Sequence, residues 1–397
     1  MRYAIDGRCI QDHFPGVARY TLNLVRALAE VAPEDEFLLL FDPSARNTRY
    51  SLEALRRQAN LRLVPGEAPV FSLSEQWRIP RQLRGLRPAL IHAPYYLRPY
   101  ALPAPVVLTA YDLIPLIYPR YFTLKERAIF RLAMGLALST AQGVIAISQA
   151  TASDLRRHYH PAPERLAVIA LAADPAFGPQ PMEAVATIRQ KYQLPERYAL
   201  YLGSNKPHKN LVRLIEAWKE VVGCELCATG YGGEVAGCST PRPVRTAHDA
   251  SQAMLVIAGH WDERYPEARE RAAALGLGGS VRFLGAVAEE HLPALYAGAE
   301  LFVFPSLYEG FGLPVLEALA CGVPVVCSNS SSLPEVAGDA ALLVDPLDVP
   351  AMAEALGRVM GDLSLRQDLR ARSLARAALF SWERTARETL AVYRNML

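Results

Sequence analysis

Short apolar runs alternate with longer amphipathic stretches along the whole chain, in two successive series. Runs rich in β-branched and aromatic residues are typical of buried strands, and the amphipathic stretches are typical of the helices that connect parallel strands. The alternation therefore predicts an α/β fold with two doubly wound parallel sheets. The expected strands are 3–6, 36–41, 61–64, 90–92, 106–109, 144–147 and 166–169 in the first series, and 198–202, 255–258, 281–284, 301–304, 325–327 and 341–344 in the second.

The two series meet at residues 172–181, where Pro and Gly interrupt the periodicity. A chain of 397 residues exceeds the size at which one hydrophobic core stops growing, so two domains are expected. We expect them to span 1–180 and 181–381, with an insertion at 222–253. The clearest helices are 17–31 and 122–141 in the first domain, and 209–222, 266–275, 289–297, 313–321 and 350–360 in the second.

The net charge of +2 gives no support for nucleic-acid binding. One stretch is locally basic, because Arg78, Arg81, Arg84 and Arg87 recur every three residues and can form a ridge along a helix. The ridge is interpreted as a solvated helix face, with contact to anionic lipids as the alternative. No run reaches the roughly 20 apolar residues of a membrane span, and no signal peptide precedes the first strand. A cytoplasmic protein is expected, with contact at the inner face of a membrane at most peripheral.

The six cysteines do not indicate a secreted disulfide framework in a chain of this length. Cys321 and Cys327 stand in apolar surroundings and are expected to be small buried residues. Residue types that bind zinc occur in and around the insertion, at Cys224, Cys227, Cys238, His248 and His260. No second C-x-x-C accompanies them, so a loose insertion is the favoured interpretation, and no metal site is predicted.

One segment of the second series combines a strand, a glycine loop and two acids. The strand 301–304 leads into a loop with Glu309, Gly310 and Gly312, and the helix that follows carries Glu317. Backbone N–H groups at such a junction bind phosphate groups, together with the positive end of the helix dipole. Helical side chains lean toward the N-terminus, so Glu317 is expected to point back toward the loop of Glu309. Because a carboxylate repels a phosphate, the two acids are expected to bind neutral hydroxyls, such as those of a sugar and a ribose.

This segment resembles the E-x7-E signature of the retaining glycosyltransferases of family four. Further stretches resemble the family in its usual order, at residues 5–8, 16–20, 203–211, 255–259, 281–285 and 332–338. The resemblance covers nearly the whole chain except residues 222–253. It implies the GT-B fold, in which two Rossmann-like domains face each other across a cleft, and a C-terminal helix, 382–397, that returns to the first domain.

The resemblance implies an enzyme, a hexosyltransferase. It would move a mannose- or glucose-type sugar from a GDP- or UDP-linked donor to a carbohydrate or lipid-linked acceptor, in glycan or cell-surface polysaccharide synthesis. No far-face nucleophile can be assigned, so front-face substitution with retention is the favoured mechanism. No cofactor is implied. The sequence contains no Asp-x-Asp pair to hold a divalent metal at the diphosphate, so metal-independent transfer is expected.

The family's functional residues match individual positions of this chain. Lys209 matches the lysine that binds the donor phosphates, Glu309 the acid that contacts the donor sugar, and Glu317 the acid that binds the ribose. With Asp112 from the first domain, Lys209 and Glu309 form the expected catalytic set. The other positions matched to donor binding are Gly16, Gly203, Ser204, Phe283, Leu284, Gly310, Phe311, Gly312 and Leu313.

Two positions depart from the family. Tyr111 precedes Asp112 where histidine is common, and a tyrosine with a pKa of about 10 does not exchange protons near neutrality. His208 stands where arginine is usual, which removes a fixed fork for phosphate unless the imidazole is protonated. These departures leave open a non-catalytic subunit that binds sugar nucleotides. A GT-B epimerase, hydrolase or phosphorylase is a further alternative. His13 and His92 are candidates by position, with structural or acceptor-side roles favoured.

Overall fold

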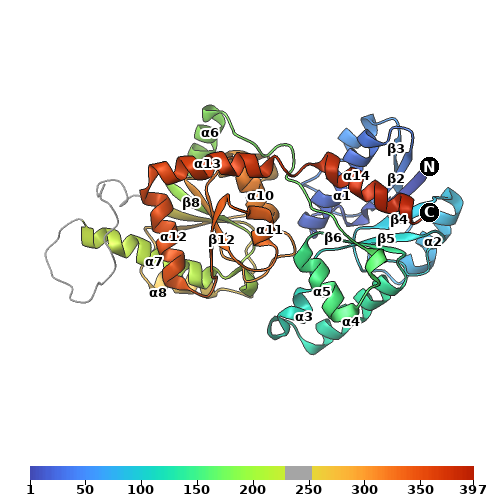
Figure 1. Cartoon of the computed structure of the whole chain (residues 1–397), viewed down its shortest axis with the longest axis horizontal. Helices are drawn as coiled ribbons and strands as arrows, with labels where there is room; N and C mark the ends of the chain where they lie inside the picture. The colour runs from blue at the N-terminus through green and yellow to red at the C-terminus, as the bar shows by residue number, and fades with distance from the viewer. Residues whose placement is uncertain (229–252) are drawn as a thin grey trace. The chain divides into compact units, whose positions relative to one another are not determined.

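The computed structural model describes residues 1–228 and 253–397 and divides into two compact units (Figure 1). Unit 1 comprises Met1–Asp174 and Phe380–Leu397, and unit 2 comprises Pro175–Leu379. Each unit contains one sheet, in which all the described strand pairs are parallel. None of the described helices combines the length and the apolar character that a membrane crossing requires.

The sheet of unit 1 has the strand order β3-β2-β1-β4-β5-β6-β7. Its strands are β1 (Arg2–Asp6), β2 (Glu36–Phe41), β3 (Leu61–Pro65), β4 (Leu90–Ala93), β5 (Val106–Ala110), β6 (Gly143–Ala146) and β7 (Leu166–Val168). Strands β2 and β3 are added on one side of β1. The chain then crosses to the other side of β1, where β4 to β7 follow in order. The loops that follow the neighbouring strands β1 and β4 therefore begin side by side at the carboxyl edge of the sheet.

Helices cover both faces of this sheet. On one face α2 (Glu75–Leu86), α4 (Leu124–Ser139) and α5 (Gln149–Tyr159) share a hydrophobic core with alternate strand residues. On the other face α1 (Pro15–Val31) packs beside the C-terminal helix α14 (Trp382–Asn395) (Figure 1). The shorter helices are η1 (Gly7–Cys9), η2 (Glu53–Arg57), α3 (Ile114–Ile117), η3 (Pro119–Tyr121) and η4 (Pro163–Arg165).

A chain of buried polar groups ties α14 to the centre of unit 1. The imidazole of His92 contacts the hydroxyl of Tyr393 at 2.5 Å and that of Thr109 at 2.8 Å, and Thr109 contacts the hydroxyl of Tyr20 at 2.9 Å. These groups come from β4, α14, β5 and α1, and each of the four side chains has a hydrogen-bond partner, as burial requires. Burial lowers the pKa of His92 to about 3, so the imidazole stays neutral. His92 therefore has a structural role.

The sheet of unit 2 has the strand order β10-β9-β8-β11-β12-β13. Its strands are β8 (Tyr198–Leu202), β9 (Met254–Ala258), β10 (Val281–Gly285), β11 (Leu301–Phe304), β12 (Val325–Ser328) and β13 (Ala341–Val344). Here the chain reverses between β10 and β11, which leaves β8 beside β11. The helices are α6 (Met182–Tyr192), η5 (Pro207–Lys209), α7 (Leu211–Ala228), α8 (Glu267–Ala274), η7 (Glu289–His291), α9 (Leu292–Ala297), α10 (Leu313–Ala320), α11 (Leu333–Ala337), α12 (Val349–Gly361) and α13 (Leu363–Ala377).

Every strand expected from the sequence is present, with ends shifted by no more than one residue. The helices are less regular. Helix α7 continues to Ala228, so the expected end at residue 222 was wrong. Gly16 lies in the first turn of α1, because Pro15 begins this helix, so the expected start at residue 17 was two residues late. Helices α6 and α13 were not expected, because each buries so few residues that no apolar stripe marks it.

The cysteine expectations divide into two groups. Cys321 and Cys327 are buried thiols, as expected, and burial raises the pKa of each to about 12. Cys238 and His248 of the candidate zinc group lie outside the described residues, as do the side chains of Cys224 and Cys227. Within the described residues, no group of three His, Cys, Asp or Glu side chains is placed to hold a metal ion.

The basic ridge exists in shortened form. Arg78, Arg81 and Arg84 are exposed on α2. Arg87 does not continue the ridge, because it follows the last turn and caps the helix in a left-handed conformation, with φ of 50°.

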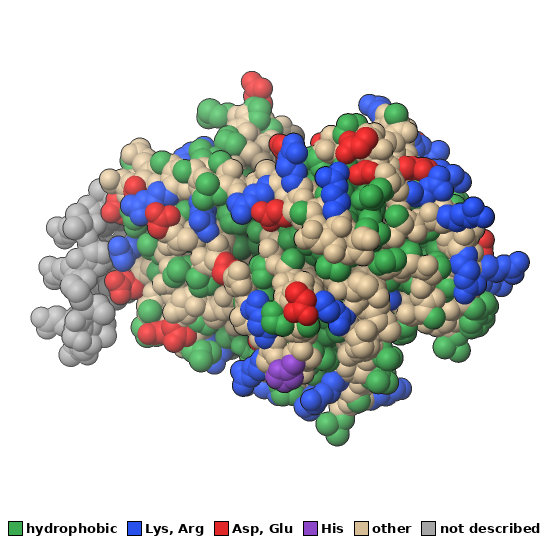
Figure 2. All heavy atoms as spheres, turned by 45° about the vertical axis from the view of Figure 1, so that its right-hand side comes forward, with side chains coloured by type: hydrophobic (Ala, Val, Ile, Leu, Met, Phe, Trp, Pro, Cys, Tyr) green, Lys and Arg blue, Asp and Glu red, His purple; other side chains and the backbone are tan. Residues whose placement is uncertain are grey.

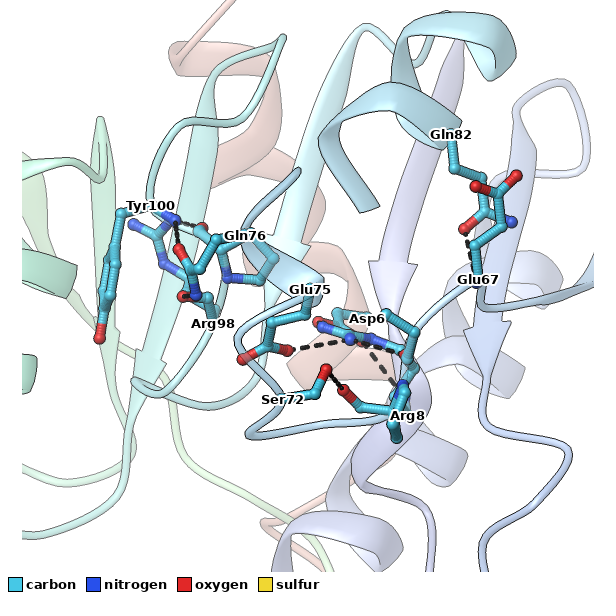
Figure 3. A network of polar contacts seen from close by, with 12 residues as sticks. Asp6, Arg8, Glu67, Ser72, Glu75, Gln76, Gln82, Arg98 and Tyr100 are labelled. Carbon is cyan, nitrogen blue, oxygen red and sulfur yellow. Dashed lines mark hydrogen bonds and ion pairs between the residues drawn. The ribbon is translucent and has the colours of Figure 1, made fainter. Parts of the chain in front are cut away.

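A buried ion network joins the end of β1 to the start of α2 (Figure 3). The guanidinium of Arg8 donates to both oxygens of Asp6, at 2.8 and 2.7 Å, and to Oε2 of Glu75 at 3.0 Å. Burial raises the pKa of Asp6, but the charge and hydrogen bonds of Arg8 outweigh burial, and the pKa falls below its usual range. Burial also raises the pKa of Glu75, and here Arg8 does not compensate, so it reaches about 7. One cation therefore serves two buried acids, of which Glu75 keeps its proton more readily.

Replacing this acid by its neutral isostere, Glu75→Gln, is expected to change how stability depends on pH. Between its usual pKa of 4.5 and about 7, Glu75 binds a proton in the folded but not in the unfolded protein, so stability falls as pH rises through this window. Relative to wild type, the free energy of unfolding of the variant should therefore be about 2–3 kcal/mol higher at pH 8 than at pH 5. Parallel urea titrations at the two pH values measure it, with the exposed Glu67→Gln as control. An equal difference at both pH values contradicts the prediction.

Candidate functional site

The loops that follow β8 and β11 bring two of the expected catalytic residues together. Nζ of Lys209, at the end of η5, lies 2.6 Å from Oε1 of Glu309, in the loop between β11 and α10. Their side chains are 16% and 12% exposed, so the pair is largely shielded yet reachable from solvent. It stands where the strand order of unit 2 reverses, the place at which open α/β sheets bind ligands.

The backbone around Lys209 is fixed from two sides. Asn210 has a left-handed conformation, with φ of 63°, and its buried amide donates to the carbonyl oxygens of Pro305 and Pro346 at 3.0 and 2.7 Å. The N–H of Leu307 donates to the carbonyl of His208 at 2.8 Å. These bonds tie the η5 turn to the loop after β11, so the spacing of the Lys209–Glu309 pair is set by backbone contacts.

His208 does not act as a cation. The residue is only 7% exposed, and burial, with the neighbouring charges of Lys209 and Lys206, lowers its pKa to about 2. The imidazole is therefore neutral over the physiological range, and Lys209 supplies the charge at this turn.

Three consecutive serines hold the loop that carries Glu309. The hydroxyl of Ser330 donates to the carbonyls of Ser306 and Leu307, at 3.3 and 3.1 Å. The hydroxyl of Ser331 accepts from the N–H of Glu309 at 2.9 Å. The hydroxyl of Ser332 donates to the carbonyls of Glu309 and Phe311, at 2.9 and 2.7 Å.

Sequence reasoning included Ser332 in a family motif but gave the serines no role. Their only sequence signal is a run of hydroxyl residues directly after an expected strand, where loops carry functional side chains.

Helix α10 begins against this loop. Gly312 caps it with φ of 104°, and a Cβ there would lie 2.6 Å from a side-chain carbon of Leu333, so the position requires glycine. Gly310 and Phe311 precede it, and Leu313 is the first helical residue. The first N–H groups of a helix have no partner within the helix, and Pro314 adds none, so this end of α10 is suited to an anion.

Glu317 lies one turn into α10 and is directed at a residue that the sequence did not identify. It is 1% exposed, and its Oε2 accepts a hydrogen bond from the hydroxyl of Tyr296 on α9 at 3.0 Å. The ring of Tyr296 packs against Phe177 and Phe302. The structure thus holds Glu317 in one position through a buried tyrosine.

Gly203 and Ser204 form the start of the loop after β8. A Cβ on Gly259, in the loop after β9, would lie 2.1 Å from the carbonyl oxygen of Gly203, so the two loops pack backbone to backbone. The hydroxyl of Tyr201 donates to the carbonyl of Ser204 at 2.8 Å. The site loops therefore rest on two glycines that allow close approach.

Phe283 and Leu284 lie in the edge strand β10, two strands away from β8. The rings of Phe283 and Trp261 form a T-shaped contact with their centroids 5.3 Å apart, and the guanidinium of Arg269 lies 4.1 Å from the centre of the Trp261 ring. Trp261 and Arg269 were missed by sequence reasoning, because no spacing in the sequence links them to Phe283.

Unit 1 contains the candidates Gly16, Asp112, Tyr111 and His13. Gly16 is exposed, with open space where a side chain would stand. The carboxylate of Asp112 accepts from the N–H of Ile114 at 3.0 Å, just after β5. The hydroxyl of Tyr111 is buried without a hydrogen-bond partner among the described residues, and burial raises its pKa well above 10. His13 is exposed and packs its ring against Phe14.

Two family models match most of the chain. The model described as Glycosyltransferase Family 4 matches residues 15–177, and that described as Glycosyl transferases group 1 matches residues 185–376. The O-antigen chain mannosyltransferase B of Escherichia coli is 33% identical over 399 residues, which cover 96% of both chains. The serotype-specific mannosyltransferase WbdA of Escherichia coli is 30% identical over 298 residues, which cover 74% of this chain and 34% of that longer protein.

Solved structures have the same fold at lower identity. Sucrose-phosphate synthase from Thermosynechococcus elongatus is similar with a TM-score of 0.74 at 21% identity, over 100% of this chain and 99% of that one. HepE from Anabaena, solved in complex with UDP-glucose, gives a TM-score of 0.71 at 18% identity over 99% of both chains. With two parallel-sheet α/β units and a relative that matches 96% of its length, this chain belongs to glycosyltransferase family 4 and is a glycosyltransferase with the GT-B fold.

Proposed function

We propose that the enzyme transfers a hexose from a nucleotide diphosphate sugar to a hydroxyl acceptor, with retention at the anomeric carbon and without a metal ion. The observation that carries the proposal is the Lys209–Glu309 pair at the strand-order reversal of unit 2. A cation and a carboxylate held together beside a helix N-terminus offer one group for a phosphate and one for a neutral alcohol. A sugar diphosphate contains both.

Lys209 and the start of α10 bind the diphosphate. As the bond between the sugar and the distal phosphate breaks, the phosphate gains negative charge, which the ammonium and the helix N–H groups stabilise. This division of labour replaces the divalent metal that other transferases use, and it agrees with the absence of an Asp-x-Asp pair from the sequence.

Glu309 accepts hydrogen bonds from hydroxyls of the donor sugar, and Glu317 accepts them from the ribose. Glu309 is already paired with Lys209, so its charge is balanced before substrate enters. Gly310, Phe311, Gly312 and Leu313 supply the backbone next to the sugar and the distal phosphate. Gly203 and Ser204 line the same site from β8, and Phe283 and Leu284 belong to the region of the base.

The reaction proceeds on one face of the sugar. The bond from the anomeric carbon to the phosphate oxygen breaks, the acceptor oxygen bonds to the same carbon from the same side, and the acceptor proton passes to the departing phosphate oxygen. Asp112 completes the proposed catalytic set, and Gly16 belongs to the proposed donor-binding residues.

The donor is GDP- or UDP-linked, and a mannose-type sugar is favoured because two relatives are named as mannosyltransferases. The acceptor is a carbohydrate or a lipid-linked glycan, in polysaccharide synthesis of the kind that the name O-antigen chain mannosyltransferase indicates for that relative. A lipid-linked acceptor requires that the enzyme work at a membrane surface.

Donor binding is expected to stabilise the protein by mass action. At a donor concentration of about 100 times Kd, the melting temperature should rise by about 5 °C. The measurement is a thermal-shift series with GDP-, UDP-, ADP- and dTDP-linked sugars, each with and without EDTA. We expect a shift with a GDP- or UDP-linked hexose that EDTA does not reduce. A shift that disappears with EDTA contradicts metal independence, and no shift with any donor contradicts the proposed substrate class.

Substitution of the central pair is expected to slow transfer strongly. Lys209→Ala and Glu309→Gln should each lower kcat/KM by about 100-fold or more, because each removes a preorganised charge at the reacting centre. Sugar transfer from the donor identified by thermal shift measures it. Lys206→Ala is the matched control, since Lys206 is an exposed lysine three residues away. Near-normal rates in both variants reject the site.

His208→Gln is expected to leave the pH profile unchanged. A group with a pKa of about 2 is neutral from pH 5 to pH 8, so a neutral replacement alters no charge in that range. The kcat/KM should stay within about two-fold of wild type, with the same profile. Loss of a limb of the pH–rate profile in the variant shows instead that His208 titrates during catalysis.

A further inference from the structure

Helix α4 of unit 1 is apolar on two opposite sides. Phe130, Met134 and other residues of one side are buried against the sheet. The outward side carries large hydrophobic side chains in contact with solvent, namely Leu124 (80% exposed), Ile129 (51%), Leu132 (67%) and Leu136 (41%). A surface helix of a globular protein is normally polar on this side. An exposed apolar stripe of this kind marks a surface that binds something.

A second group of exposed hydrophobic residues lies at the start of α2. Leu73 is 84% exposed, Trp77 is 61% exposed and Phe71 is 46% exposed. The basic residues Arg78, Arg81 and Arg84 continue along the exposed side of the same helix.

The two groups lie on the same face of unit 1. Helices α2 and α4 share one hydrophobic core and cover one face of the sheet. They are also joined through Arg98. Its carbonyl accepts from the side chain of Gln76 on α2 (Figure 3). Its guanidinium donates to the carbonyl of Ala137 and the hydroxyl of Thr140, at the end of α4. We call the exposed side of these two helices, with Phe71 and Leu73, the α2–α4 face.

The charge of the α2–α4 face is positive. Arg78, Arg81, Arg84, Lys125 and Arg131 are exposed on the two helices. These two fully described helices contain two acids. Glu75 is buried and forms an ion pair with Arg8, and Glu126 caps the start of α4 together with Thr123. The space-filling view shows hydrophobic and basic side chains next to one another along the lower margin (Figure 2).

We infer that the α2–α4 face docks on a bilayer surface that contains anionic lipids. Leucine side chains and an exposed tryptophan among arginines suit the boundary between head groups and acyl chains, where the aliphatic part enters the apolar layer and the cations meet phosphates. A second copy of the chain fits less well, since two such faces would oppose five exposed cations to five others. The inference rests on the proposed function only in that a lipid-linked acceptor gives docking a purpose.

Vesicle binding by the full chain tests the inference. The purified protein is sedimented with phosphatidylcholine vesicles, with and without phosphatidylglycerol, and binding is expected only when the anionic lipid is present and to weaken as salt rises. The double variant Leu132→Gln/Leu136→Gln should bind at least about ten-fold less. Arg81→Glu and Lys125→Glu should each cost about five-fold. The matched controls in unit 2 are Leu363→Gln, a leucine of similar exposure, and Lys219→Glu.

Tryptophan fluorescence locates the contact. Trp77 is well exposed, whereas Trp218 and Trp382 are buried and Trp261 is half-buried in unit 2. Anionic vesicles should therefore shift the emission to shorter wavelength, and Trp77→Phe should abolish the shift. The inference is overturned if wild-type protein fails to bind anionic vesicles, or if Leu132→Gln/Leu136→Gln binds them as well as wild type. A dimer in solution that the same double variant dissociates also overturns it. Donor-induced thermal shifts should be equal in all these variants, so failure of docking and failure of the proposed transfer are read separately.

Discussion

The adjacency of β8 and β11 is the constraint on which the candidate site depends. Strands β9 and β10 are added on one side of β8, and the chain then crosses to the other side, where β11 pairs with β8. Only this reversal brings the loop of Lys209 next to the loop of Glu309, residues that are a hundred positions apart in sequence. Without the crossover the same motifs would stand at distant edges of the sheet, and neither would have a partner of opposite charge.

Rigid support suits that adjacency to the catalytic role that we propose for it. The loop of Glu309 is fixed by the hydroxyls of Ser331 and Ser332 and closed by Gly312, and the turn of Lys209 is fixed by the amide of Asn210. In the proposed reaction, charges held by such bonds need little reorganisation when the leaving phosphate develops charge, and this preorganisation is the main source of electrostatic catalysis. The buried carboxylate of Glu317 is likewise held in place, by a hydrogen bond from the hydroxyl of Tyr296.

Unit 1 uses buried charge for a different purpose. Arg8 connects the end of β1 to α2 through Asp6 and Glu75, and Arg98 connects α2 to the end of α4. These links hold together the helices that present the α2–α4 face. The same two helices thus have a buried side that stabilises the domain and an exposed side whose composition suits a lipid surface.

The sequence by itself determined the strands, because a parallel strand buried on both faces must be a continuous apolar run, and such a run is visible without a structure. It also predicted Lys209 and Glu309 as candidate residues, since their motifs are local. It did not reveal the serines at 330–332, Tyr296 or Trp261 as partners, because those contacts join segments far apart in the chain. Tertiary structure alone decided that His208 is neutral and that Glu75 holds its proton near pH 7, since a pKa depends on which distant residues exclude water from the group.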